Sequence, residues 1–146
     1  MWCRHTCSNA GLCNESRKIK LDNHFTVTPR FATKMLEKAL RLYTPSLSEK
    51  PMAEFLADKC DDLGFEDIQI DEVGNVIAKK GSGSPKIMLC GHMDVVPGKV
   101  KVRTEGDSLY GRGASDAKAP LMAMLFAAAS IEKNQGTVTF VGAVDE

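Results

Sequence analysis

Apolar residues between positions 31 and 63 recur every three or four residues, which is the period of an amphipathic helix. This period covers residues 31–43 and stops at a Thr-Pro-Ser sequence, so a first helix is predicted there. It resumes over residues 52–63, which predicts a second helix with Ser48 as its N-cap and Gly64 at its end. We expect both helices to cover a sheet.

The pattern then changes to the two-residue alternation of strands. Residues 65–78 are predicted to form a β-hairpin in which residues 74–75 make the turn. A Gly- and Ser-rich loop is predicted at residues 81–85. The apolar run at 87–89 predicts a buried strand, after which we expect the chain to turn at Gly91.

Four more elements are predicted beyond that turn. Two short strands are expected at residues 100–103 and 108–110, separated by turn residues at 105–107. A segment rich in Ala, Met and Leu at 119–133 predicts a helix, and residues 137–144 predict a further strand. Helical and strand periods therefore alternate along the chain, which indicates an α/β layer fold.

The composition is that of an ordinary globular protein, with 43% hydrophobic and 26% charged residues. Its 19 basic and 19 acidic residues balance without forming a basic stripe, so no nucleic-acid partner is expected. No apolar segment approaches the length of about 18 residues needed to span a membrane, so no membrane partner is expected either. Because residues 1–20 lack the apolar core of a signal peptide, we expect a cytoplasmic protein whose five cysteines are reduced. Cys60 and Cys90 are expected to be buried as small apolar side chains.

Candidate metal ligands occur in two places. Near the start, Cys3, His5, Cys7 and Cys13 could hold zinc, although their spacing matches no common zinc pattern and a disordered polar leader is the simpler interpretation. The second set follows predicted strands or a glycine-rich loop, where polar groups reach one edge of a sheet. Its members are His92, Asp94, Asp116, Asp145 and Glu146.

The set also has structural interpretations, because His92 could be a structural histidine, Asp116 a helix cap, and the terminal acidic residues 145–146 solvated. Together they form the imidazole and carboxylate set that suits two divalent metal ions. Asp94 lies two residues from His92 and could accept the proton of the ring nitrogen that does not bind metal. Glu146 could then accept a proton from the attacking water.

Three segments resemble the ordered motifs of one family, the co-catalytic zinc aminoacyl hydrolases of the acetylornithine deacetylase and succinyl-diaminopimelate desuccinylase type. These segments are LCGHMDVVP at 89–97, LYGRGASDAK at 109–118 and VDE at 144–146. The resemblance runs from about residue 35 to the end. The short connection at 97–110 is similar to the branch that releases lysine or ornithine from an amino-group carrier protein.

The resemblance implies a three-layer catalytic domain, with a mixed β-sheet and flanking helices, and a role for each motif residue. His92 would bind one metal, and Asp94 would orient the His92 imidazole. Asp116 would bridge both metals, and Glu146 would be the general base. The complete site would hold two Zn²⁺ ions, or Co²⁺ or Mn²⁺ in their place. The resemblance also implies a cis peptide bond between Asp116 and Ala117.

This chain ends before several parts of the family pattern, namely a second glutamate, a later carboxylate, a distant histidine and a lid domain that supplies dimer contacts. We therefore expect residues 35–146 to be the truncated, N-terminal part of the catalytic domain, with weak metal binding and no turnover. Residues 1–34 are expected to be a disordered leader or sequence upstream of a true start at Met35. The parent protein is expected to be a homodimer.

The resulting hypothesis is a metal-dependent hydrolase of amino-acid biosynthesis, on the lysine or arginine route. It would cleave an N-acyl or isopeptide-like amide in a small-molecule or carrier-protein-linked substrate and release a free amino acid such as lysine or ornithine. Another deacylase, desuccinylase or dipeptidase of the same family is the nearest alternative. A non-catalytic module that holds zinc through the N-terminal cysteines, or an α/β fragment without its own function, remains open.

Overall fold

The computed structural model describes residues 26–132 and 134–145. The N-terminal cluster of Cys3, His5, Cys7 and Cys13 lies outside these described residues, and so does Glu146.

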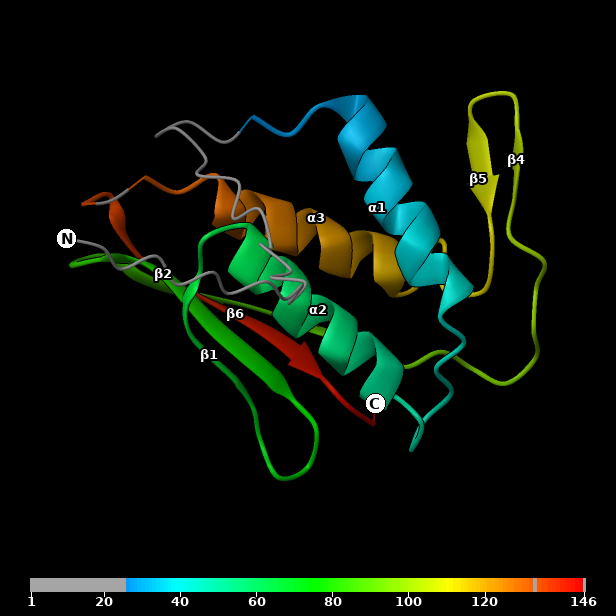
Figure 1. Cartoon of the computed structure of the whole chain (residues 1–146), viewed down its shortest axis with the longest axis horizontal. Helices are drawn as coiled ribbons and strands as arrows, with labels where there is room; N and C mark the ends of the chain where they lie inside the picture. Colours follow the sequence, from blue (N-terminus) through cyan, green and yellow to red (C-terminus); the bar gives the residue numbers. More distant parts are fainter. Residues whose placement is uncertain (1–25, 133, 146) are drawn as a thin grey trace, which may run out of the picture.

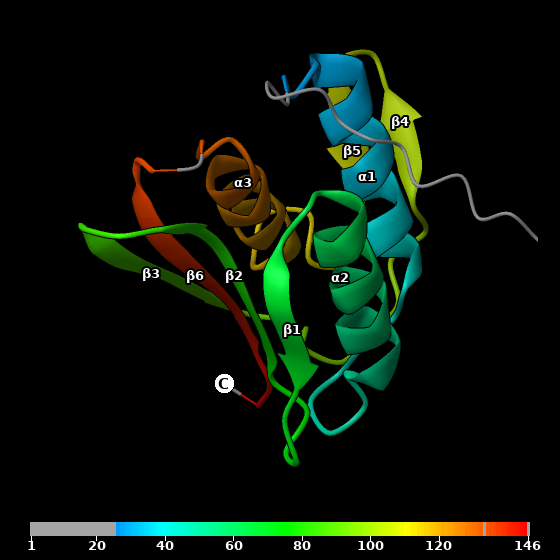
Figure 2. The ribbon, with the colours of Figure 1, turned by 60° about the vertical axis from the view of Figure 1, so that its left-hand side comes forward.

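Four strands form one mixed sheet in the order β1-β2-β6-β3; Figure 1 labels three of them, and Figure 2 shows all four side by side. The strands β1, β2 and β6 are antiparallel neighbours, whereas β3 runs parallel to β6. Their bounds are Glu66–Ile70 for β1, Val76–Ser82 for β2, Lys86–His92 for β3 and Gly136–Ala143 for β6. A separate two-stranded ribbon consists of β4, Arg103–Glu105, and β5, Ser108–Tyr110. The mixed sheet that the family resemblance implies is therefore confirmed.

The three helices of the described residues lie on one side of the sheet, and two of them pack directly on its strands (Figure 2). They are α1, Pro29–Arg41, α2, Lys50–Asp62, and α3, Lys118–Ala129. The helix α2 packs on β1 and β2, α3 packs on β3 and β6, and α1 packs on α3. The core between helices and sheet includes Met52, Leu56, Leu121, Leu125 and Phe140, each fully buried. The described residues thus supply the sheet and one helical layer, and none of their helices is long and apolar enough to cross a membrane.

The helix boundaries follow the capping residues. The first helix begins at Pro29, two residues before the predicted start, because the Thr28 hydroxyl accepts a hydrogen bond from the Phe31 amide and proline suits the first turn. The expected domain boundary at Met35 falls inside this helix. At the other end of α2, the prediction for Gly64 is confirmed, since its φ of 73° lies in the left-handed region favoured by glycine.

The predicted N-cap of α2, Ser48, is wrong. The N-cap is Glu49, whose backbone is already helical and whose side chain makes no cap hydrogen bond to α2. Its carboxylate instead accepts a hydrogen bond from the Leu47 amide, which precedes the helix. This buried glutamate therefore belongs to the chain between the helices.

Strand β3 differs from the prediction in burial and length. Because β3 is at the edge of the sheet, Ile87 is 49% and Met88 is 66% exposed, and Cys90 is exposed rather than buried. The expected turn at Gly91 is also wrong, since the strand pairs with β6 through His92. Cys60 is buried in the core, as predicted.

The bounds of three other elements differ from the prediction. The strand β2 continues to Ser82, into the predicted loop, because β6 supplies pairing partners over that whole length. The strand β4 begins at Arg103, where the predicted strand ends. The helix α3 ends at Ala129, four residues before the predicted end, with Ser130 as its C-cap.

Candidate metal centre

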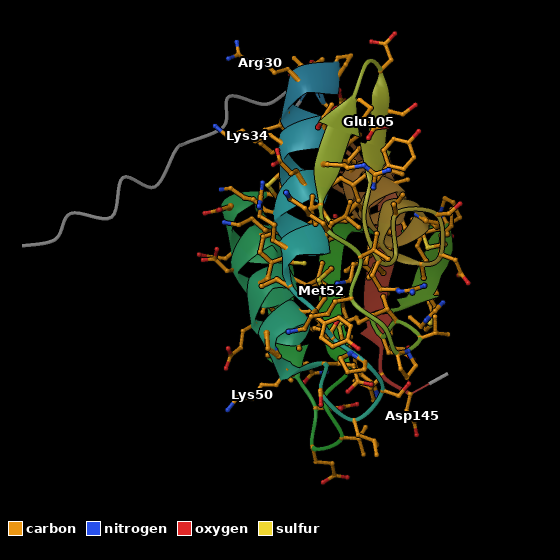
Figure 3. The ribbon with its side chains drawn as sticks, turned by 90° about the vertical axis from the view of Figure 1, so that its right-hand side faces the viewer. Arg30, Lys34, Lys50, Met52, Glu105 and Asp145 are labelled. Atoms are coloured by element: carbon orange, nitrogen blue, oxygen red, sulfur yellow. The ribbon has the colours of Figure 1, made fainter. Side chains whose placement is uncertain are left out.

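The parallel pairing of β3 and β6 brings their carboxyl ends to one edge of the sheet. His92, the last residue of β3, pairs with Ala143 at the end of β6, and the Met93 amide donates to the Ala143 carbonyl at 2.8 Å. Asp94 follows β3, and Asp145 follows β6. Asp145 and Lys50 at the start of α2 lie at the same end of the molecule (Figure 3).

Asp94 and His92 form a hydrogen-bonded pair whose orientation is defined. The His92 Nδ1 lies 2.9 Å from Asp94 Oδ1, and the Ser46 hydroxyl donates to Asp94 Oδ2 at 2.7 Å. Burial by itself would raise the pKa of Asp94, but the hydrogen bonds from Ser46 and His92 outweigh it and hold that pKa below its usual value. An ionised carboxylate only accepts hydrogen bonds, so the proton of this pair is on Nδ1.

Asp116 approaches the same histidine from a different part of the chain. It lies in the loop between β5 and α3, and its Oδ1 is 3.4 Å from His92 Nε2. Its side chain is 87% exposed, against 7% for Asp94. The peptide bond from Asp116 to Ala117 is cis, as the family resemblance implies.

A glycine in this loop allows the close packing that holds it. Gly113 has a φ of 84°, and a Cβ atom there would lie 2.8 Å from the Val95 side chain. The Lys118 amide donates to the Gly113 carbonyl at 3.0 Å. A side chain at position 113 would therefore push the loop of Asp116 away from the segment of Asp94.

The donor pair of His92 and Asp116 fits a metal ion. With the ring proton on Nδ1, Nε2 presents a lone pair towards the Asp116 carboxylate. Two ligands of a tetrahedral zinc ion, each about 2.0 to 2.1 Å from the metal, lie about 3.4 Å apart. Across residues 26–132 and 134–145, no group of three or more such donors comes together, so the described residues supply a pair of ligands.

Sequence reasoning missed four polar residues beside this pair, namely Thr44, Ser46, Glu49 and Lys118. The Thr-Pro-Ser sequence indicated only the end of a helix, and Lys118 was noted as part of a motif without its burial. Lys118 is fully buried, and its Nζ donates to the carbonyls of Ala39 and Leu42 at the end of α1. Burial lowers the pKa of Lys118 to about 8.

Comparison with known proteins identifies similar sequences. Residues 88–146 match the family model described as peptidase family M20/M25/M40. A protein of Pyrococcus abyssi with the provisional name LysW-lysine/LysW-ornithine hydrolase is 46% identical over 113 residues, which are 77% of this chain and 32% of the relative. The LysW-lysine hydrolase of Deinococcus radiodurans is 38% identical over 109 residues, which are 73% of this chain and 30% of the relative. The chain thus spans about a third of the length of these relatives.

A solved structure supports the fold. The chain resembles a dinuclear metal-binding peptidase of family M20 from Bacillus subtilis with a TM-score of 0.56 and 19% sequence identity. The match covers 79% of this chain and 34% of that structure. The described sheet and helices therefore correspond to part of a larger domain of this fold.

Proposed function

We propose that this chain is part of a metal-dependent hydrolase of the peptidase family M20/M25/M40, whose model residues 88–146 match, and that the whole protein releases lysine or ornithine from a carrier-linked amide. The observation that carries the proposal is the approach of His92 Nε2 to Asp116 Oδ1, with Asp94 behind the imidazole ring. The names of relatives at 46% and 38% identity support the choice of substrate.

In this proposal each residue has one task. His92 Nε2 and the Asp116 carboxylate hold metal, and Asp94 keeps the ring oriented by accepting the Nδ1 proton. Zn²⁺, or Co²⁺ or Mn²⁺ in its place, would supply Lewis-acid polarisation of the scissile carbonyl. Glu146 takes a proton from the attacking water and passes it to the leaving amine as the carbon–nitrogen bond breaks, so a carboxylic acid and a free amine result.

The finer parts of the proposal concern the whole protein. The substrate is a lysine or ornithine joined to a carrier protein, and the pathway is lysine or arginine biosynthesis. We also propose that the complete protein is a cytoplasmic homodimer. Activity of the full-length gene product on carrier-linked lysine, measured against acetylornithine, tests the substrate, and preference for acetylornithine would reject it.

Metal binding by this chain tests the site directly. Co²⁺ is titrated into the wild type, His92→Gln and Asp116→Asn while absorption is recorded, with Asp107→Asn as the matched control. Asp107 is an exposed aspartate in the turn between β4 and β5. Because each site variant removes one ligand, we expect Co²⁺ affinity to fall about tenfold or more in both and to stay unchanged in the control. Wild-type affinity in His92→Gln and Asp116→Asn would reject the site.

A further inference from the structure

The chain between α1 and α2, residues 42–49 and here called the connector, runs beside the candidate metal centre. It first contacts the segment that follows β3. The Thr44 hydroxyl donates to the Met93 carbonyl at 3.1 Å, and the Val95 amide donates to the Thr44 carbonyl at 3.0 Å. Pro45 and Val95 add a parallel β-bridge. The connector is therefore paired, by backbone and side chain, with the residues on both sides of Asp94.

Ser46 extends this contact to the functional side chains. Its hydroxyl donates to Asp94 Oδ2 at 2.7 Å, while Asp94 Oδ1 faces His92 Nδ1 at 2.9 Å. Each carboxylate oxygen thus has its own partner, one from the connector and one from the imidazole ring. Rotation of the Asp94 carboxylate would break both hydrogen bonds, so Ser46 restricts the orientation of His92 through Asp94.

Glu49 makes the second connection, at the end of the connector. Its side chain is buried, and one oxygen, Oε1, accepts hydrogen bonds from the Leu47 amide at 2.9 Å and the Asp145 amide at 3.3 Å. Asp145 follows β6 and precedes residue 146, and its φ is 52°. Glu49 therefore fixes the backbone at the point where β6 leaves the sheet.

Lys118 makes the third connection, at the start of the connector. Its Nζ donates to the Leu42 carbonyl and, at 3.0 Å, to the Ala39 carbonyl. Lys118 lies two residues after Asp116. One short segment thus contacts the chain beside Asp94, at Lys118 and at Asp145.

We propose that the connector is the positioning element of the site, with Ser46 acting on His92 through Asp94 and Glu49 acting through the backbone of Asp145. A cover that merely filled space would meet the site with apolar side chains. These contacts instead are polar, are made by residues of the connector itself, and reach groups within two residues of each proposed ligand or base. The inference rests on the proposed function, because it explains how parts distant in sequence keep the geometry that hydrolysis needs.

The test uses the full 146-residue chain and a spectroscopic readout that does not depend on metal. The ring ¹⁵N shifts of His92 are read through its carbon-bound protons and assigned with His92→Gln. Ser46→Ala removes the hydroxyl, Ser46→Thr retains it, and Ser48→Ala is the matched control from the same connector. In Ser46→Ala we expect the Nδ1 and Nε2 shifts to move towards each other, because a less restrained carboxylate no longer selects one tautomer. Ser46→Thr and Ser48→Ala should keep the wild-type shifts.

A second pair of variants tests Glu49. In Glu49→Ala we expect the Asp145 amide signal to lose its hydrogen-bonded shift, whereas Glu49→Gln retains an acceptor oxygen and should keep it. The urea midpoint of every variant is recorded, so that unfolding of the chain can be distinguished from a local change at His92 or Asp145. If Glu49→Ala does not fold, Glu49→Met gives the same comparison with a longer apolar side chain.

Co²⁺ titration of the same variants tests whether the orientation of His92 affects metal affinity. Partners that orient metal ligands contribute about 10- to 100-fold in affinity. Asp94 contacts the metal ligand His92, and Ser46 is one hydrogen bond further from that ligand. We therefore expect Ser46→Ala to weaken Co²⁺ binding roughly 3- to 10-fold and Ser46→Thr to keep wild-type affinity. Wild-type His92 shifts in Ser46→Ala, together with a wild-type Asp145 amide in Glu49→Ala, would overturn the inference. Unchanged Co²⁺ affinity in His92→Gln would instead reject the proposed function, and the ring shifts would still decide the role of the connector.

Discussion

His92 and Asp116 come within 3.4 Å of each other from two arms of the chain that are anchored differently. In the His92 arm, residues 92–95, the side chain that orients the imidazole is itself buried and has a partner on each oxygen. In the Asp116 arm, residues 111–118, the carboxylate is 87% exposed and the buried anchor is Lys118. In the His92 arm, hydrogen bonds fix the side chain of Asp94 directly. In the Asp116 arm, the buried Lys118 fixes the backbone close to the exposed Asp116 side chain.

The buried anchors of the two arms should therefore contribute to the stability of the fold, and the exposed carboxylate of Asp116 to metal binding. Removal of the buried anchors should lower the free energy of unfolding, because their partners would lose hydrogen bonds inside the protein. Removal of the exposed carboxylate should leave the fold intact and affect only what binds there. The first two predictions test this separation, and two more test hydrogen bonding and burial elsewhere; their expected effects decrease from first to last.

The largest effect is expected at Lys118. Lys118→Ala removes the donor to the Ala39 and Leu42 carbonyls and leaves a cavity, so the free energy of unfolding should fall by about 2 to 4 kcal/mol. Asp116→Ala, two residues away and exposed, should change it by less than about 0.5 kcal/mol. Urea unfolding followed by circular dichroism measures both values. Equal losses in the two variants would contradict the distinction between the exposed ligand and its buried anchor.

Asp94→Ala is expected to have the next largest effect. It removes the partner of both Ser46 and His92 from a nearly buried position, which should cost about 2 to 3 kcal/mol. The same unfolding experiment applies, with Asp107→Ala as the exposed control. A loss in Asp94→Ala as small as in the control would mean that the His92 arm is not anchored by its carboxylate.

Acid should weaken the hydrogen bonds that the Asp71 carboxylate accepts in the turn between β1 and β2. The Asn75 side chain, with the amides of residues 73–75, donates hydrogen bonds to Asp71 and lowers its pKa. A carboxyl group whose pKa is lowered on folding adds stability above its unfolded pKa of about 3.9, and this stability is lost as pH falls through the folded value. Wild type should therefore be more stable than Asp71→Asn at pH 6, and the difference should shrink towards pH 3. Urea midpoints across this range measure it, and a constant difference would contradict the prediction.

The smallest effect is a difference in thiol reactivity, without a change in stability. Cys90 lies on the exposed strand that leads into the His92 arm, whereas burial raises the pKa of Cys60 to about 12. Alkylation of Cys60 should be at least about 100-fold slower than that of Cys90 at pH 8, because the thiolate is the reactive form. Mass spectrometry of the peptides separates the two sites. Similar rates would contradict the burial of Cys60 or the exposure of Cys90.

The predicted elements were correct wherever local pattern and final packing agree. The helical period found α1 and α2, and alternation found the hairpin of β1 and β2. The prediction for β3 was wrong in burial because an apolar run shows that a residue favours burial, while the place of a strand in the sheet decides whether neighbours cover it. Ser48 was wrong as an N-cap because Glu49 begins the helix and Leu47 and Asp145 bind its carboxylate.

Some residues of the site were also predictable from local sequence, whereas others were identified only by the folded structure. The motif residues His92, Asp94 and Asp116 were selected from the sequence, and the structure places them together, while their proposed roles stay predictions. Ser46 could not be selected, because no period or spacing links it to a residue 48 positions away. Only the folded contact identifies it.

By itself, the sequence determined the chemistry that is available and the order in which the elements appear, since residue type and hydrophobic period are local properties. The tertiary structure decided which face of β3 is open and which carboxylates are buried. It also decided that one connector meets three distant segments. These depend on strand pairing and packing between parts of the chain far apart in sequence, which no local pattern records.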